Sequence, residues 1–169
     1  MCARLSPEKN IHTALYAFAQ LKKEYDQASL TIVGDGIERQ VLEKIVRVLH
    51  LSDAVSFVGW QTSIKNFLLK SDILLVTSYF EGYGMVMVEA ASVGCPIVTT
   101  PVGIAEDLLA TSVVISNGYD VDSITSALKD ALQDPNTLNK NRVSAFSHIK
   151  KVLLTESEYK DFYRAIFTF

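Results

Sequence analysis

The sequence predicts an α/β fold in which a doubly wound parallel sheet is covered by helices on both faces. Short runs rich in β-branched residues alternate several times with longer runs of helical periodicity. That order is typical of parallel strands joined by helical crossovers. One run, residues 72–78, is apolar at consecutive positions, as expected for a strand that is buried on both faces.

Each element is predicted from its own pattern. Ile11, Leu15, Phe18 and Leu21 recur at helical spacing and predict a helix over residues 10–24. Residues 1–5 are a short strand that ends at a Ser-Pro turn, so we expect the chain to start within a strand. Further strands are predicted over residues 29–33, 54–59, 72–78, 96–100 and 112–116, and further helices over residues 36–51, 63–70, 84–93, 120–133, 137–150 and 155–167.

Composition limits the class of protein. The 169 residues fit a single domain over residues 1–169, and 49% apolar with 21% charged residues indicates a packed core. The net charge of −3 argues against nucleic acid as a partner. Cys2 and Cys95 lack a pairing motif, which suits a reducing cytoplasm, and no run reaches the roughly 18 apolar residues of a membrane span.

Candidate ligand residues follow the strands, because ligands of open α/β sheets bind at the carboxyl ends of the strands. After the run 29–33 come Gly34, Asp35 and Gly36, where glycine lets a backbone approach a ligand. A tight turn explains the same residues equally well.

The segment after residues 72–78 contains more candidate ligand-binding residues than the Gly-Asp-Gly segment. Gly82 and Gly84 free the backbone just before the helix predicted to start near Met85, whose first N–H groups lack internal partners. Glu81 precedes them, either as a cap for the helix or as an acceptor for a polyhydroxylated ligand. Glu89 lies in the same helix, which is apolar all round and is therefore expected to be buried.

Two cations stand beside the first strand. Arg4 ends that strand and Lys9 follows its turn. Both suit a diphosphate, since arginine binds phosphate through two parallel hydrogen bonds and lysine acts as a point charge. Surface charge at a helix start is the alternative, although cations are unfavourable there.

No metal site is expected. His12, His50 and His148 lie on separate predicted helices without ligand spacing. The sequence also lacks a Ser–His or Cys–His constellation and a P-loop lysine, which argues against covalent hydrolysis and P-loop phosphoryl transfer.

Taken together, these segments resemble the C-terminal, donor-binding half of retaining group-1 (family 4) glycosyltransferases of the GT-B fold. The resemblance covers nearly the whole chain and is strongest in "EGYGMVMVEAASVGCPIVTT", where two glutamates are separated by seven residues. The other matching segments are "ARLSPEKNIHTALYAFAQL", "LTIVGDGIERQVLEK" and "VSFVGW".

This resemblance implies a Rossmann-like domain that binds a nucleotide-diphosphate sugar as donor substrate, without a cofactor or metal. Arg4 and Lys9 would neutralise the diphosphate, and Glu81 would contact hydroxyls of the sugar. Glu89 would accept hydrogen bonds from the ribose. The remaining expected contacts are backbone amides around Gly82, Tyr83, Gly84 and Met85 for sugar and phosphate, Gly34 in the Gly-Asp-Gly segment, and Phe57 and Val58 near the nucleobase.

The pattern departs from the family after the next strand, where a single glycine, Gly103, stands in place of Gly-Gly. Glu106 is then either a ligand contact or a helix cap. The family also has an N-terminal acceptor domain, which 169 residues are too few to include. That domain would carry any peripheral contact with the inner membrane face; otherwise we expect a cytoplasmic location.

The donor nucleotide stays open among UDP-, GDP- and ADP-sugars. Two alternative functions remain, an epimerase of nucleotide sugars with the same architecture and a non-enzymatic, receiver-like nucleotide-binding module. An epimerase needs acid and base residues that we do not find. A receiver needs clustered acids where Arg4 stands and a lysine where Thr99, Thr100 and Pro101 stand.

Overall fold

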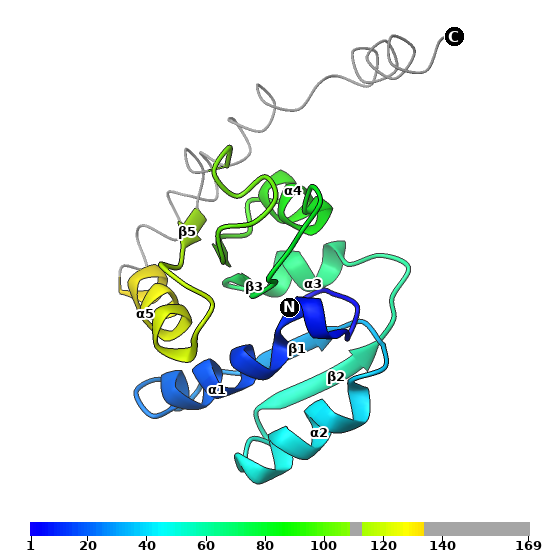
Figure 1. Ribbon diagram of the computed structural model, residues 1–169, viewed down its shortest axis with the longest axis vertical. Coiled ribbons are helices and arrows are strands. Elements are labelled where there is room, and N and C mark those ends of the chain that lie inside the picture. Colours follow the sequence, from blue (N-terminus) through cyan, green and yellow to red (C-terminus); the bar gives the residue numbers. More distant parts are fainter. Residues whose placement is uncertain (109–112, 134–169) are drawn as a thin grey trace, which may run out of the picture.

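The alternating pattern of the sequence folds into alternating strands and helices (Figure 1). The computed structural model describes residues 1–108 and 113–133. The helices predicted over residues 137–150 and 155–167 lie outside the described residues. In chain order the elements are the 3₁₀ turn Pro7–Lys9, α1 (Ile11–Lys22), β1 (Leu30–Val33), α2 (Arg39–Val48), β2 (Val55–Gly59), α3 (Lys65–Lys70), β3 (Leu74–Val76), α4 (Met85–Ser92), β4 (Ile97–Thr99), β5 (Val113–Ile115) and α5 (Val121–Leu132).

All pairing between these strands is parallel, as predicted. β1 pairs with β2, while β3, β4 and β5 form a second ladder in that order. Residues 1–5, predicted as a short strand, contain an isolated bridge rather than a full strand, and we call them the N-terminal segment. It runs alongside β1, with Cys2 opposite Val33 in a parallel bridge and the Ala3 N–H donating to the Val33 carbonyl at 3.0 Å. Figure 1 shows the amino terminus between β1 and β3.

Two hydrophobic clusters show that the β3–β4 region is buried on both faces. Leu75 and Val98 belong to a cluster that includes side chains of α1 and α5. Leu74, Val76 and Ile97 belong to the other cluster, together with side chains of α4. Alternate residues of a strand point to opposite faces, so helices cover both faces of this ladder, as the sequence predicts.

The loops that follow the N-terminal segment, β1, β2 and β3 all lie at the carboxyl ends of parallel strands. This is the edge at which open α/β sheets bind ligands. The residues singled out in the sequence fall in these loops or just beyond them.

Candidate functional site: a cleft at the carboxyl ends of the strands

A cleft of about 820 Å³ opens at this edge of the sheet. The N-terminal segment and the loop after β1 form one side, and α4 and the loop after β2 complete it. The lining includes one basic side chain of the N-terminal segment, Arg4, and one acidic side chain of α4, Glu89. The cleft is lined by Cys2, Ala3, Arg4, Val33, Gly34, Asp35, Trp60, Gln61, Thr62, Ser63, Ile64, Lys65, Leu68, Val86, Glu89, Ser92 and Val93.

Glu89 is exposed to solvent at this cleft. The expectation that it is sealed in a helix buried on every side is therefore wrong. Only one face of α4 is packed, through Met87, Val88, Ala90 and Ala91, while Met85 is 57% exposed. Periodicity did not reveal this, because the open face of α4 also carries apolar residues. An exposed carboxylate at the cleft is free to accept hydrogen bonds from a ligand.

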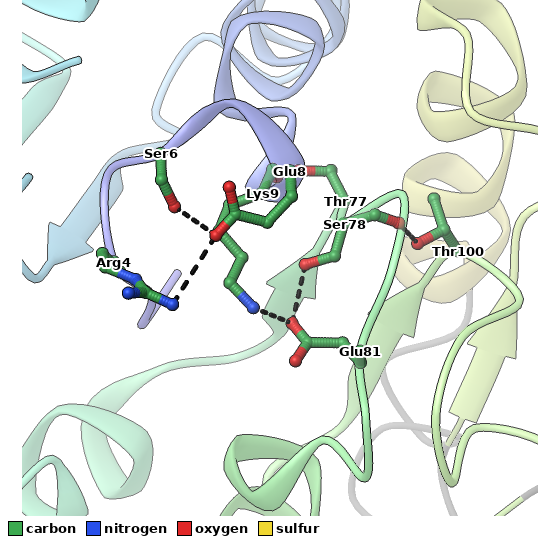
Figure 2. A network of polar contacts seen from close by, with 8 residues as sticks. All are labelled: Arg4, Ser6, Glu8, Lys9, Thr77, Ser78, Glu81 and Thr100. Atoms are coloured by element: carbon green, nitrogen blue, oxygen red, sulfur yellow. Dashed lines mark hydrogen bonds and ion pairs between the residues drawn. The ribbon is translucent and has the colours of Figure 1, made fainter. Parts of the chain in front are cut away.

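Lys9 and Glu81 form an ion pair beside the cleft, with 2.8 Å between Lys9 Nζ and Glu81 Oε1 (Figure 2). Both side chains are largely buried, at 16% and 14% exposed. The Ser78 hydroxyl donates to the same oxygen at 2.7 Å. In the part of the chain that the structure describes, no hydrogen bond involves the other oxygen, Oε2. One oxygen of Glu81 is thus held in place while the other is left for a ligand.

Buried hydroxyls fix the backbone on both sides of this ion pair. The Thr77 hydroxyl donates to the carbonyl of Lys9 at 2.9 Å. The Thr100 hydroxyl, at the end of β4, donates to the carbonyl of Ser78 at 2.6 Å. The Tyr79 N–H donates to the carbonyl of Glu8 at 2.8 Å. The two loops that carry the ion pair are therefore joined directly by hydrogen bonds.

Arg4 is placed more loosely. Its side chain is 74% exposed, and its guanidinium lies 3.7 Å from Glu8 Oε1. The Ser6 hydroxyl donates to the same Glu8 oxygen at 2.6 Å (Figure 2). This hydrogen bond lowers the pKa of Glu8 below its ordinary value, with a smaller contribution from Arg4. Glu8 therefore stays ionised near Arg4, but an exposed pair of this kind is weak and exchanges its partner easily.

A second contact joins the loop after β3 to the start of α5. The rings of Tyr79 and Tyr119 lie 5.6 Å apart in a tilted arrangement. The Asn10 side-chain amide, one residue beyond Lys9, donates to the Tyr119 carbonyl at 3.2 Å. The loops after the N-terminal segment, β3 and β5 thus meet beside the ion pair.

The glycines of the site differ in how much space their surroundings leave for a side chain. A Cβ on Gly34 would lie 1.9 Å from the Ala3 carbonyl oxygen, and one on Gly36 would lie 2.3 Å from that of Leu5. Both glycines therefore allow the N-terminal segment to pass close by, a packing role that the sequence analysis did not predict. A Cβ on Gly82 would meet nothing within 4 Å. Space around Gly82 thus leaves room for a ligand to approach its backbone.

Gly84 begins α4 in the left-handed conformation, with φ of 87°. The amides of the first turn of a helix have no partner within the helix, and they carry its positive dipole end. Tyr83 and Met85, on either side of Gly84, are both exposed. Gly103 has φ of 55°, and a Cβ there would lie 2.6 Å from the Tyr83 carbonyl oxygen, so this single glycine holds the next loop against the start of α4.

The structure brings some of the predicted residues together and separates others. Arg4, Gly34 and Glu89 share the cleft, and Lys9 meets Glu81 next to it. Glu106 is exposed within turns after β4. Phe57 does not line the cleft, because its ring packs against Arg39 with 5.2 Å from guanidinium to ring centre. Val58 lies instead on a second cavity at the opposite edge of the sheet.

Sequence reasoning missed Trp60 and Ser78. Trp60 is 72% exposed and lines the cleft just after β2, in the place expected for Phe57 and Val58. The rule that ligands bind after the strand ends would have indicated it. Ser78 had a weaker signal, a hydroxyl three residues before Glu81.

No metal-binding cluster of three or more His, Cys, Asp or Glu side chains is formed within residues 1–108 and 113–133. Over the same residues, none of the helices combines the length and the apolar character needed to cross a membrane. Cys2 lies in the cleft wall, and its burial raises the pKa of the thiol, so this side chain is neutral near pH 7.

Solved structures show which known fold this chain has. HepE from Anabaena, in complex with UDP, superposes with a TM-score of 0.85 at 22% identity, over 99% of this chain and 47% of that chain. TarM from S. aureus gives a TM-score of 0.87 at 18% identity, over 96% of this chain and 34% of that chain. The chain has the Rossmann-like fold of one half of a GT-B glycosyltransferase.

The sequence comparison narrows this class to a family. The family model described as glycosyl transferases group 1 matches residues 1–156. The chain therefore belongs to the group 1 glycosyltransferases, which confirms the resemblance seen in the sequence.

Two curated relatives show how much of a whole protein this chain represents. A glycogen synthase from Mycobacterium tuberculosis is 31% identical over 136 residues, which cover 78% of this chain and 33% of that protein. The poly(glycerol-phosphate) alpha-glucosyltransferase of Bacillus subtilis is 28% identical over 152 residues, or 88% of this chain and 23% of that protein. The chain thus spans a third or less of these two relatives.

Proposed function

We propose that this chain binds the nucleotide-diphosphate sugar donor of a retaining glycosyltransferase. As part of a longer protein, it would transfer the sugar to a glycan or lipid-linked acceptor. The observation that carries the proposal is the meeting of two cations and two acids at one edge of the sheet. Arg4 and Glu89 line one cleft, and Lys9 and Glu81 are paired next to it.

The arrangement matches the charges of such a donor. A diphosphate carries negative charge, for which Arg4 and Lys9 are suitable partners. The sugar and the ribose carry hydroxyl donors, for which Glu81 Oε2 and Glu89 are suitable acceptors. Names of relatives support this assignment, since HepE was crystallised with UDP and with UDP and glucose. They favour glycosyl transfer over the epimerase alternative.

The proposed chemistry is cleavage of the bond between sugar and diphosphate through an oxocarbenium-like transition state. Negative charge grows on the departing diphosphate. Lys9, Arg4 and the amides at the start of α4 would stabilise that charge, and groups fixed in advance are most effective in this role. The hydrogen bonds from Ser78 to Glu81 and from Thr77 to the Lys9 carbonyl supply such fixation. We expect the reaction to need no metal ion, because two side-chain cations at the site could neutralise the diphosphate.

The acceptor site would belong to a second domain. We expect this domain on the amino side of a longer protein, together with any peripheral contact with the inner membrane face. Cys2 and Cys95 lack a pairing motif in the sequence, which suits the reducing cytoplasm, and we place the reaction there. The 169-residue chain alone is expected to bind donor weakly and to transfer no sugar.

Calorimetric titration with UDP-, GDP- and ADP-glucose tests the proposal. One of the three is expected to bind, and Arg4→Ala is expected to weaken it roughly 10- to 100-fold, the loss of one charge-assisted hydrogen bond of about 1.5–3 kcal/mol. Arg47→Ala is the matched control, because Arg47 is exposed at the end of α2 and does not line the cleft. Equal effects of the two substitutions, or no binding of any donor, would reject the proposal.

A further inference from the structure

The end of β2 is irregular just before the chain reaches the cleft. Ile32 of β1 pairs with Phe57 of β2. The next residue of β1, Val33, pairs with Gly59, so Val58 has no partner in β1. This extra residue forms a β-bulge, which bends a strand and redirects the side chains that follow it. The bulge therefore sets the direction in which the chain enters the loop after β2.

The bulge separates two side chains that a regular strand would keep together. If β2 continued regularly, Val58 and Trp60 would point to the same side, because side chains alternate along a strand. Val58 instead lines the cavity at the opposite edge, while Trp60 lines the cleft and is 72% exposed. Gly59 between them has φ of 73°, and its carbonyl accepts from the Gly34 N–H at 2.8 Å. The place of Trp60 in the cleft thus depends on this irregular backbone.

Two side chains bond to the carbonyls of the bulge. The Arg39 guanidinium donates to the Phe57 carbonyl at 3.3 Å. The Gln61 side-chain amide donates to the Val58 carbonyl at 3.1 Å. Arg39 also lies over the Phe57 ring, with 5.2 Å from guanidinium to ring centre, an arrangement that attracts a cation to the face of the ring. Gln61 is exposed, whereas the Arg39 side chain is only 28% exposed, so Arg39 is the firmer of the two contacts.

Each nitrogen of the Arg39 guanidinium has a partner within the protein. Nε donates to Glu43 Oε1 at 2.6 Å, Nη1 lies 3.8 Å from Asp35 Oδ2, and Nη2 bonds to the Phe57 carbonyl. The Asp35 side chain is 59% exposed, so that ion pair is weak. Arg39 does not line the cleft. Any effect of Arg39 on a ligand must therefore pass through the residues that it holds.

We propose that Arg39 is a positioning residue that fixes the bulge of β2 and thereby holds Trp60 in the cleft. A planar guanidinium can cover the Phe57 ring and bond to the Phe57 carbonyl at once, which the ammonium of a lysine cannot match. The effect on Trp60 is a property of the free chain. Its consequence for donor binding rests on the proposed function, which assigns the donor to this cleft.

Trp60 is the single tryptophan of the chain, so tryptophan fluorescence reports on this position alone. Time-resolved anisotropy without ligand is expected to show more nanosecond motion of Trp60 in Arg39→Ala than in the unsubstituted chain. Arg39→Lys keeps the charge and the helix propensity but is expected to restore the rigidity only in part. It also keeps the comparison valid if Arg39→Ala fails to fold. Arg47→Ala, at the exposed end of the same helix, is the matched control and should change nothing.

A double-mutant cycle with Trp60→Ala tests the consequence for binding. Calorimetry uses the sugar nucleotide that the titration above identifies as the donor. Arg39→Ala alone is expected to weaken its binding roughly 2- to 10-fold, as for the loss of one hydrogen bond. In the Trp60→Ala chain the same substitution is expected to have no further effect, because the side chain that Arg39 positions is gone. A merely structural role of Arg39 would weaken binding equally in both chains.

Unchanged motion of Trp60 in Arg39→Ala, or rigidity in Arg39→Lys equal to that of the unsubstituted chain, would overturn the proposal. Full additivity in the binding cycle would overturn it too. The anisotropy needs no ligand, so it gives its answer even if none of the sugar nucleotides binds. That last result would reject the proposed function, and the motion of Trp60 would still support or reject the role of Arg39.

Discussion

The two oxygens of Glu81 differ in their contacts. Oε1 accepts from both Lys9 and Ser78, so the side chain is held before any ligand arrives. Under the proposed function, Oε2 would accept from hydroxyls of the donor sugar. Lys9 would then exchange its carboxylate partner for a phosphate when the donor binds.

Glu81→Gln separates the sugar contact from the phosphate contact. With UDP-glucose taken as the donor that the titration identifies, its binding is expected to weaken roughly 10- to 100-fold relative to UDP alone, because only the sugar nucleotide loses a charge-assisted hydrogen bond. UDP itself is expected to bind no more weakly, since Lys9 is released from its ion pair. Calorimetry with both ligands gives the ratio of their dissociation constants. Glu24→Gln, at the edge of the sheet opposite the cleft, is the control. Equal weakening of both ligands would contradict this role.

Ser78 is expected to act through Glu81. Ser78→Ala removes one donor from a carboxylate that Lys9 still holds, so UDP-glucose affinity is expected to fall only roughly 2- to 10-fold, less than the loss of a direct charge-assisted contact. In the double variant with Glu81→Gln, the two effects should not add, because they share one interaction. Ser52→Ala, at an exposed turn, is the control. Full additivity would show that Ser78 affects binding by another route.

At the scale of loops, Gly34 and Gly82 make a matched pair. Gly34→Ala places a Cβ against the Ala3 carbonyl oxygen at a φ of +134°, and is expected to lower the free energy of unfolding by roughly 2 kcal/mol or more. Gly82→Ala places its Cβ in open space and is expected to change the free energy of unfolding by less than about 1 kcal/mol. It is expected to weaken UDP-glucose binding, because the added methyl group would occupy the space left for the ligand. Urea unfolding and calorimetry check both. A tolerated Gly34→Ala would contradict the packing described here.

The start of α5 gives a pH dependence with a definite sign. Asp120 caps this helix, accepting from the Ser123 N–H at 2.9 Å and the Ser123 hydroxyl at 2.6 Å. Its pKa is lowered below the ordinary 3.8, first by the Ser123 hydroxyl and then by the Ser123 N–H. The folded state therefore favours the ionised form. This stabilisation is complete above the unfolded pKa and disappears as pH falls through the folded pKa.

Asp120→Ala is accordingly expected to lower the midpoint of thermal unfolding at pH 7. The difference from the unsubstituted chain should shrink as the pH falls below 3.8. Asp120→Asn can still cap the helix, so it should lower the midpoint of thermal unfolding less than Asp120→Ala does. Asp130→Ala, exposed on the same helix, controls for removal of charge. A difference that is constant from pH 7 to pH 2 would contradict the capping role.

The elements themselves were predictable from sequence because periodicity and burial agree along most of the chain. The exceptions are physical. Residues 72–78 look like one long strand, but β3 covers only Leu74–Val76. The hydroxyls of Thr77 and Ser78 bond to the Lys9 carbonyl and to Glu81, contacts far apart in sequence that no local pattern shows. No local pattern reveals that Lys9 meets a carboxylate 72 positions away. Nor does hydrophobicity distinguish the packed face of α4 from its open face at the cleft.

At the scale of the whole molecule, the parallel sheet was the safest prediction and is confirmed. Parallel pairing brings the loops after the strands to one edge, so Arg4, Gly34 and Glu89 share one cleft, whereas Val58 lines the cavity at the opposite edge. Donor identity and acceptor are not encoded in this way. We expect them to depend on side chains such as Trp60 and on a second domain, neither of which follows from the alternation of strands and helices.

The distribution of charge predicts a response to salt. The net charge is −3, so attraction of a diphosphate depends on local cations, and Arg4 is largely exposed to solvent. Salt screens exposed charges over about 10 Å at 0.1 M. Affinity for UDP-glucose is expected to fall several-fold between about 0.05 M and 0.5 M salt. Arg4→Ala should flatten this dependence, as calorimetry at several salt concentrations would show; an unchanged slope would contradict it.

The contacts around the ion pair close into a ring. Lys9 leads to Asn10, Asn10 bonds to Tyr119, Tyr119 touches Tyr79, and two residues later Glu81 returns to Lys9. A ligand that separates Lys9 from Glu81 breaks one contact of this ring, while the other contacts still hold the backbone in place. Ligand binding would then require only a rotamer change of the Lys9 side chain, without a backbone rearrangement, and ligand release would restore the starting geometry.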